Sequence, residues 1–332
     1  MNILIVGSGS IAIRHAKNIR ALVDGAEITI LRSSGPKSST GEEPAIRVAD
    51  HIAYCLEDAL AKNPTIALIC CATSAHVNYA LMLAKHGIHI FVEKPLSHSR
   101  LGLDELEAAI KDNKLTFLVG YNFRFSKTLA GLRRLVVRGE IGTIVSVRIE
   151  AGQYLPEWRG YDYRQTTSAH RELGGGVVLE LSHELDYFCW IFGAPSLVYA
   201  RLSRRGSLEI DVEDTADIMV ETVHGVVGMI HLNMIQKTKS RTCEVVGTNG
   251  SLTWNGVSDE ITGITRQGKK IEVTGAKDDS NQMYVDELRY FLACVDGLNQ
   301  YDLNFERERQ VVEFILAVKE SASKAVPVKL LG

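Results

Sequence analysis

The chain has 332 residues, of which 45% are hydrophobic and 23% charged, and its formal net charge at pH 7 is −3. A single core rarely grows past about 250–300 residues, so this length predicts about two domains and excludes one undivided globule. A nucleic-acid binder normally shows a basic excess, and none is visible. The longest apolar stretches, residues 66–72 and 187–192, are too short to span a bilayer. We therefore expect no nucleic-acid partner and no membrane partner.

The cysteines form no C-x-x-C pair and no zinc-binding spacing, so we expect no metal site. Residue 1 leads directly into a strand-like run, which leaves no space for a signal peptide. Free cysteines in apolar runs are typical of a reducing compartment, and the expected location is cytoplasmic. The six cysteines are Cys55, Cys70, Cys71, Cys189, Cys243 and Cys294.

The first third of the chain alternates short β-branched runs with amphipathic stretches. Strands are predicted at residues 3–6, 27–31, 66–71, 88–92 and 115–119. Helices are predicted at residues 11–22, 75–86 and 101–112. Strands and helices in alternation indicate βαβ units and a parallel sheet.

The pattern changes after about residue 122. A helix at 127–138 and an alternating strand at 144–149 precede a polar, aromatic loop at 153–172 and an apolar helix at 177–192. Further strands follow at 215–223, 225–233, 242–246 and 251–254, and helices at 282–295 and 305–323. Consecutive strands without helices between them favour a large, mainly antiparallel, open sheet. The expected fold class is α/β, with a Rossmann domain at 1–121 and an α/β domain at 122–332, whose closing helix at 305–323 packs back on the first domain.

A glycine-rich turn follows the first strand and opens the first helix. Gly7, Gly9 and Ala12, with Ser10 and Ile11 between them, match the G-x-G-x-x-A dinucleotide fingerprint. The helix N-terminus behind such a turn presents free N–H groups to a phosphate. The alternative is a glycine-rich turn that binds nothing.

The end of the second strand indicates which ribose is bound. An NAD-binding protein usually places an acidic residue there, but this strand ends in Arg32, Ser33 and Ser34. A cation and two hydroxyls suit the 2′-phosphate of NADP. The expected cofactor is therefore NADP, with NAD as the alternative if Arg32 is only a solvated loop cation.

Two segments carry candidate catalytic groups. Lys94 follows the strand at 88–92, at the edge where open α/β sheets bind ligands. Farther on, Glu180, His183 and Asp186 follow a triple glycine at spacings that place neighbours together on one helix. Taken alone, Lys94 fits a surface lysine and His183 fits a core histidine.

Together these motifs resemble the Gfo/Idh/MocA oxidoreductase family over nearly the whole chain. The matching pieces are the fingerprint at residue 7, His15, the segment 72–76, Glu93-Lys94-Pro95, the segment 122–125, Trp158-Arg159, and the glycines and His near residue 183. The family implies a Rossmann domain, a nicotinamide cofactor, a sugar or polyol substrate, and oligomers formed through the open sheet.

The resemblance also implies roles for individual residues. Lys94 and His183 are the catalytic pair, with His183 exchanging the proton of the reacting hydroxyl and Lys94 orienting it. The residues expected at the cofactor, beyond the fingerprint and Arg32 to Ser34, are Thr73, His76, Glu93, Lys94, Asn122, Trp158 and Arg159. The residues expected at the substrate are Lys94, Arg124, Tyr154, Tyr163, His183 and Asp186.

The chain departs from the family pattern at one position. Many relatives carry an Asp four residues before the histidine, and here that position is Leu179, while Glu180 lies three before. Either Glu180 takes that role in catalysis or the role is vacant.

The leading prediction is an NADP-dependent oxidoreductase of a sugar, sugar acid or nucleotide-sugar. The alternatives are a non-catalytic sensor of dinucleotide or sugar with the same fold, and a reductase of a non-sugar ring. Apolar positions on the strands at 215–233 indicate a sheet face buried against another subunit, so a homodimer or homotetramer is expected. These positions are Met219, Met229, Ile230, Leu232 and Met234.

Overall fold

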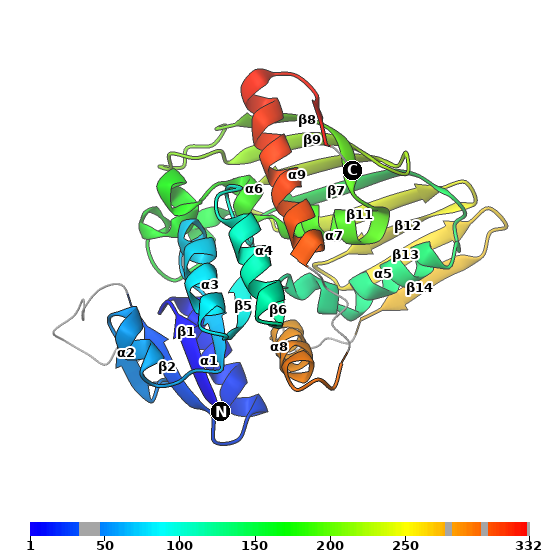
Figure 1. Cartoon of the computed structure of the whole chain (residues 1–332). Coiled ribbons are helices and arrows are strands. Elements are labelled where there is room, and N and C mark those ends of the chain that lie inside the picture. The colour runs from blue at the N-terminus through cyan, green and yellow to red at the C-terminus, as the bar shows by residue number, and fades with distance from the viewer. Residues whose placement is uncertain (33–46, 276–280, 300–304, 331–332) are drawn as a thin grey trace. The chain divides into compact units, whose positions relative to one another are not determined.

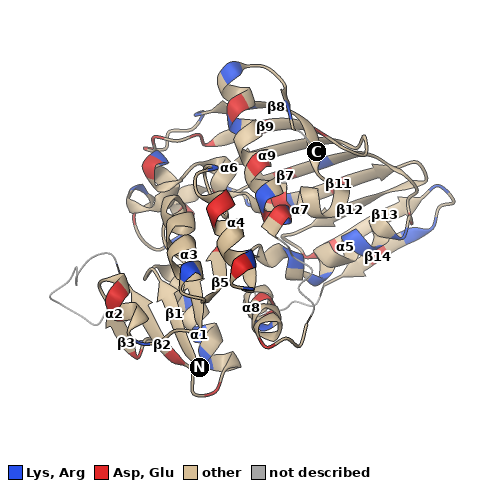
Figure 2. Cartoon of the chain, in the orientation of Figure 1, with Lys and Arg blue, Asp and Glu red and all other residues tan. Residues whose placement is uncertain are grey.

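The computed structural model describes residues 1–32, 47–275, 281–299 and 305–330 (Figure 1). The chain divides into two compact units, the first made of Met1–Tyr121 and Asn281–Arg309, the second of Asn122–Ser280 and Gln310–Gly332. Positive and negative residues are interspersed along the helices and strands of both units (Figure 2). Among the described residues, no helix is long and apolar enough to cross a membrane.

The described residues of the first unit form a six-stranded parallel sheet in the order β3-β2-β1-β4-β5-β6. The strands are β1 (Asn2–Val6), β2 (Glu27–Leu31), β3 (His51–Ala53), β4 (Ile66–Ile69), β5 (His89–Glu93) and β6 (Phe117–Gly120). Their residues are mostly buried, as in sheets covered by helices on both faces. This order is that of a dinucleotide-binding fold, and it confirms the predicted parallel sheet.

Five helices of the first unit's described part accompany this sheet. They are α1 (Ser10–Leu22), α2 (Leu56–Leu60), α3 (His76–Lys85), α4 (Leu103–Asp112) and α8 (Gln282–Val295). Helix α8 comes from the far end of the chain, and its Leu288, Phe291 and Leu292 share one buried cluster with Ile3 and Ile28. The hydrophobic core of the first unit is therefore built from two distant stretches of sequence.

The second unit contains a nine-stranded sheet among its described residues, in the order β14-β13-β12-β11-β7-β10-β9-β8-β15. The strands are β7 (Ile144–Gly152), β8 (Pro195–Ser203), β9 (Thr215–Thr222), β10 (Val227–Asn233), β11 (Ser240–Gly247), β12 (Gly250–Asn255), β13 (Glu260–Thr265), β14 (Lys270–Thr274) and β15 (Val328–Lys329). Among the strand pairs of the described residues in this sheet, only β7 and β10 run parallel, which confirms the predicted mainly antiparallel sheet.

The two faces of this sheet differ. Along β9 and β10 buried and exposed residues alternate, so one face is covered and the other is open. On the covered side, Trp254 of β12 donates its indole N–H to Thr128 of α5 (Lys127–Val137) at 2.9 Å. Helix α9 (Phe305–Lys324) also lies over this side of the sheet (Figure 1). Its Phe314 contacts Phe188, with ring centroids 6.0 Å apart. The first residues of α9 belong to the first unit, where Phe305 contacts Phe117.

The prediction of one continuous helix at 177–192 is wrong. The segment forms α6 (Val177–Glu180) and α7 (His183–Phe192), separated by Leu181, whose φ of −100° and ψ of 34° are not helical. Ser182 then precedes the new helix and makes no side-chain capping hydrogen bond. Because the residues on both sides are apolar, hydrophobic periodicity alone does not reveal this break.

Candidate active site

The fingerprint turn in the first unit has the geometry that a dinucleotide requires. Gly7 has φ +110°, and a Cβ atom there would lie 2.8 Å from the carbonyl oxygen of Cys70, so only glycine fits. At Gly9, by contrast, a Cβ would meet nothing within 4 Å, which leaves open space above the turn. Gly9 precedes α1 and supplies no side-chain cap, so the first-turn N–H groups, at Ser10, Ile11 and Ala12, can receive a phosphate.

The strand end that we associate with the ribose is described only as far as Arg32. This residue is 5% exposed and donates its backbone N–H to the Ala53 carbonyl at 3.0 Å. It is therefore not a freely solvated loop cation. Ser33 and Ser34 lie outside the described residues.

Glu93, at the end of β5, is anchored by a buried histidine. His15 Nε2 donates to Glu93 Oε1 at 2.6 Å, and the Lys94 backbone N–H lies 3.3 Å from the other carboxylate oxygen. His15 is fully buried, with its ring edge-on to Phe91 at a centroid distance of 5.1 Å. A carboxylate oxygen of Glu287, on α8, lies within 4.8 Å of the His15 nitrogen and the Glu93 oxygen. Buried polar side chains from three distant parts of the chain thus meet at the residue next to Lys94.

His76, at the start of α3, contacts the two segments that follow β4 and β5. Its ring nitrogens lie 2.9 Å from the Pro95 carbonyl and 3.1 Å from the Cys71 carbonyl. Burial lowers the pKa of His76, so the neutral ring is favoured. Thr73, also buried, begins the short helix Thr73–Ala75 just before it. His76 therefore connects the end of β4 to the segment that carries Lys94.

In the second unit, His183 is the first residue of α7 and is 9% exposed. Its ring packs edge-on against Phe123, with centroids 4.9 Å apart. Arg241 of β11 lies over Phe123, its guanidinium carbon 4.5 Å from the ring centroid. Arg241 Nε is also 2.8 Å from an oxygen of Glu184, a fully buried carboxylate. An aromatic ring and an ion pair therefore fix the surroundings of His183.

A second buried ion pair involves Asp186, two residues after Glu184 on α7. Arg124, on the short helix Asn122–Phe125, directs Nε to both carboxylate oxygens of Asp186 at 3.1 Å, and its Nη2 contacts the same carboxylate. The exposed side-chain fractions are 4% and 1%. Glu180 ends α6, on a different helix from His183, and accepts a hydrogen bond from Ser168 Oγ at 2.8 Å.

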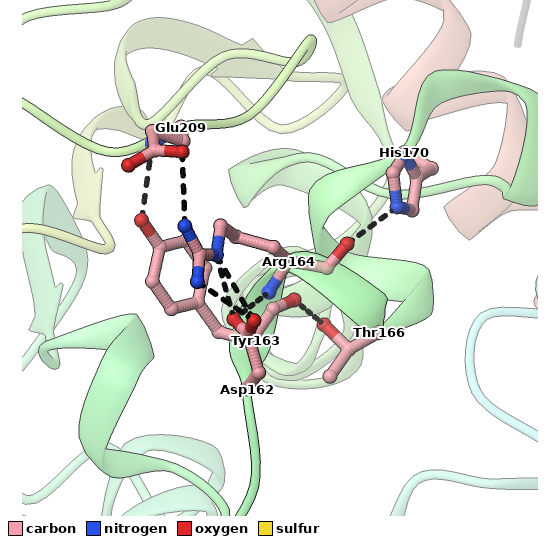
Figure 3. A network of polar contacts seen from close by, with 6 residues as sticks. All are labelled: Asp162, Tyr163, Arg164, Thr166, His170 and Glu209. Atoms are coloured by element: carbon pink, nitrogen blue, oxygen red, sulfur yellow. Dashed lines mark hydrogen bonds and ion pairs between the residues drawn. The ribbon is translucent and has the colours of Figure 1, made fainter.

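The aromatic loop after β7 is held by the network in Figure 3. Arg164 Nε donates to both oxygens of Asp162 at 2.9 and 3.0 Å, and Nη1 to Glu209 at 3.1 Å. The hydroxyl of Tyr163 accepts the backbone N–H of Glu209 at 3.1 Å. His170 contacts the carbonyl of Arg164 at 2.6 Å. These bonds tie the loop to the segment before β9.

Several buried polar atoms of the second unit have no hydrogen-bond partner among the described residues, and two of them, Asn122 Oδ1 and Trp158 Nε1, belong to residues expected at the cofactor. Buried polar groups without partners are uncommon in proteins, and a bound ligand is one way to satisfy them. Arg159 points Nη1 at the Tyr161 hydroxyl, 3.3 Å away.

The sequence reasoning missed Glu184 and Arg241. One available signal is strand alternation, because Arg241 shares the inward-facing parity of Cys243 and Val245, which are fully buried. A charged residue at such a position needs a partner.

Comparison with known proteins places this geometry in a family. Residues 1–121 match the model of an oxidoreductase family with an NAD-binding Rossmann fold, and residues 129–253 match the GFO/IDH/MocA C-terminal domain. The uncharacterized oxidoreductase YrbE of Bacillus subtilis is 30% identical over an alignment that covers 74% of this chain and 71% of that protein. The chain belongs to the Gfo/Idh/MocA oxidoreductase family.

Membership confirms the predicted family and an oxidoreductase that binds NAD(H). Myo-inositol 2-dehydrogenase of Thermotoga maritima is 24% identical, with 99% of this chain and 98% of the relative aligned. The solved structure of a levoglucosan dehydrogenase in complex with NADH has a TM-score of 0.86 at 20% identity, covering 100% of this chain and 99% of that one. At that identity the structural likeness concerns the fold alone.

Proposed function

We propose that the protein transfers a hydride between a nicotinamide dinucleotide and a CH–OH carbon of a sugar, sugar acid or nucleotide-sugar. The observation that carries this proposal is the setting of His183, a histidine held on Phe123 and flanked by two buried ion pairs on the same helix. Burying two carboxylates beside a histidine is costly unless each is paired. The two ion pairs keep His183 in the one orientation that proton transfer requires, and this role accounts for that cost.

The residues divide the work of the reaction. When bound, the nicotinamide ring gives or accepts the hydride. His183 exchanges the proton of the reacting hydroxyl, and Lys94 donates a hydrogen bond that orients and polarises that hydroxyl. Arg124 borders the substrate, and Asp186 acts through Arg124 as a positioning residue. Asn122 and Trp158 supply polar contacts to the cofactor or substrate.

Turnover by variants of the catalytic pair tests this mechanism. Lys94→Ala and His183→Ala should each lower kcat by about 10²–10⁴-fold, the usual contribution of acid–base catalysis. Dinucleotide affinity should survive His183→Ala. The assay is a screen of sugars and nucleotide-sugars in which the absorbance of NADPH or NADH measures turnover. Near-normal turnover in both variants would refute the assignment, and a wild type that binds the dinucleotide but turns over no sugar would favour a sensor.

The cofactor preference is the finer part of the proposal. We assign NADP rather than NAD, because buried Arg32 at the end of β2 supplies a cation where an acidic residue would repel the 2′-phosphate. A charged hydrogen bond contributes about 1.5–3 kcal/mol, so kcat/KM should favour NADP by at least about tenfold. Ser33→Asp should shift the preference towards NAD. A wild type that favours NAD would overturn this assignment.

The open face of the large sheet supports a homodimer or homotetramer. Of the positions predicted for this face, Met219 and Met229 are 52% and 53% exposed, whereas the prediction is wrong for Ile230, Leu232 and Met234, which are buried within the chain. Tyr199, 44% exposed, lies in register with Met219 and Met229 on β8, β9 and β10. Exposed apolar patches of this kind are typical of subunit contacts. Light scattering of the wild type should show an oligomer, and Met229→Lys should weaken it. A monomer at micromolar concentration would refute the proposal. We also assign a reducing, cytoplasmic setting, supported by the free state of all six cysteines.

A further inference from the structure

Three cations occupy alternate positions where the chain passes from β10 to β11: Lys237 and Lys239 lie in the connection, and Arg241 is the second residue of β11. The backbone of this connection is held in place. The side-chain amide of Gln236 donates to the Thr238 carbonyl at 2.6 Å and to Ser240 Oγ at 2.9 Å. The backbone N–H of Gln236 donates to Asn233 Oδ1 at 2.9 Å. The cations therefore stand on a defined turn.

Arg241 connects this turn to the candidate catalytic histidine. Its guanidinium lies over one face of Phe123, and His183 contacts the same ring edge-on. The ion pair with Glu184 keeps Arg241 in that position. The basic turn and His183 are thus joined through one aromatic ring within the second unit.

The two lysines lack acidic partners in the described part of the chain. Lys237 lies 5.7 Å from the ring centroid of Tyr154, a residue that the sequence analysis assigns to the substrate, and Lys239 is exposed. The carboxylates of α7 are already engaged, Glu184 with Arg241 and Asp186 with Arg124. Partial desolvation and the nearby charge of Arg241 lower the pKa of Lys239. An incoming anion would relieve this crowding of positive charge.

We propose that Lys237 and Lys239 bind an anionic group of the substrate, so that the substrate is a sugar acid or a sugar phosphate rather than a neutral polyol. This inference rests on the proposed function, because it concerns the same substrate. The anionic group takes no part in the hydride transfer. It anchors the sugar, and the hydroxyl to be oxidised is presented to His183 from the other end of the molecule.

Matched sugars test the inference. The panel is glucose, galactose and N-acetylglucosamine, each as the neutral sugar, the uronate and the 6-phosphate, assayed with the full-length protein and NADP or NAD. The wild type should show a higher kcat/KM for an anionic member than for its neutral parent. Comparison of the uronates with the 6-phosphates shows whether the protein prefers a carboxylate or a phosphate. Added salt should raise KM for the anionic member only.

Variants separate this inference from the mechanism. Lys237→Ala and Lys239→Ala should each raise KM for the anionic sugar by at least about tenfold, with kcat and the neutral sugars little changed. Lys270→Ala removes an exposed lysine of β14 and is the matched control. Calorimetry with the same anions, on the cofactor-loaded wild type and the variants, measures binding without turnover.

The possible failures differ in meaning. Turnover of neutral sugars that is equal to or better than that of their anionic forms would overturn the inference while the proposed function stands. Unchanged KM in both lysine variants would do the same. If no anion of the panel binds more tightly than its neutral parent in calorimetry, the inference is also overturned, whatever the activity. Loss of the proposed function is detected separately, by unaltered turnover in Lys94→Ala and His183→Ala.

Discussion

The two units position their proposed ligand-binding residues in different ways. In the first, the main device is the backbone: Gly7 takes a conformation that side chains avoid, and Gly9 leaves the N-terminus of α1 uncovered. In the second, the device is paired charge, with Arg124–Asp186 and Arg241–Glu184 both buried beside His183. Backbone recognition suits a cofactor with constant phosphates, whereas placed side chains suit a substrate that varies between relatives.

The largest expected effect is a loss of stability when the Arg124–Asp186 ion pair of the second unit is broken. Asp186→Ala leaves the Arg124 guanidinium buried without its partner, which should lower the free energy of unfolding by about 3–5 kcal/mol. The double variant Arg124→Met, Asp186→Leu should recover much of that loss, because no charge remains to desolvate. Denaturant titration of the three proteins measures both. A loss below about 1 kcal/mol in Asp186→Ala would show that the pair contributes as little as a surface ion pair.

An intermediate effect is expected in the glycine turn of the first unit. Substitution of Gly7 should lower stability, whereas substitution of Gly9 should lower cofactor affinity. Gly7→Ala forces a Cβ against Cys70 in an unfavourable conformation and should cost about 1–3 kcal/mol of stability. A Cβ at Gly9 meets no protein atom within 4 Å, so Gly9→Val should fold normally. Its side chain is expected to block the approach of the pyrophosphate to the backbone. Thermal melting and calorimetry with the dinucleotide distinguish the two. Unchanged cofactor affinity in a folded Gly9→Val protein would remove the Rossmann assignment.

The smallest effect is a pH dependence in the first unit. Burial lowers the pKa of His76, so the unfolded chain binds this proton more readily than the folded one. The contribution of His76 to stability is therefore present above the unfolded pKa of about 6.5 and is lost as the pH falls below it. The melting temperature of the wild type should fall more between about pH 7.5 and 5.5 than that of His76→Asn. Parallel falls in the two proteins would contradict this assignment.

The features that could be predicted from the sequence are those that depend on neighbours in the chain. The glycine fingerprint, Lys94 after its strand and the alternation of strands and helices are all local, and the parallel and antiparallel sheets follow from them. The pairing of Arg124 with Asp186 spans 62 positions. Arg241 and Glu184 likewise meet only after the sheet has formed. The break at Leu181 depends on a single backbone conformation inside an apolar run, and no periodicity records it.

Helix α8 has a consequence for the order in which the protein can form. During synthesis the ribosome releases the six strands of the first sheet long before it releases Gln282–Val295. Until then Ile3 and Ile28 lack the Leu288, Phe291 and Leu292 side chains that complete their cluster. A nascent chain therefore carries an unfinished nucleotide-binding core while the whole second sheet is made. We therefore expect cofactor binding to follow the completion of this core, and a fragment that stops at residue 121 to keep apolar surface exposed.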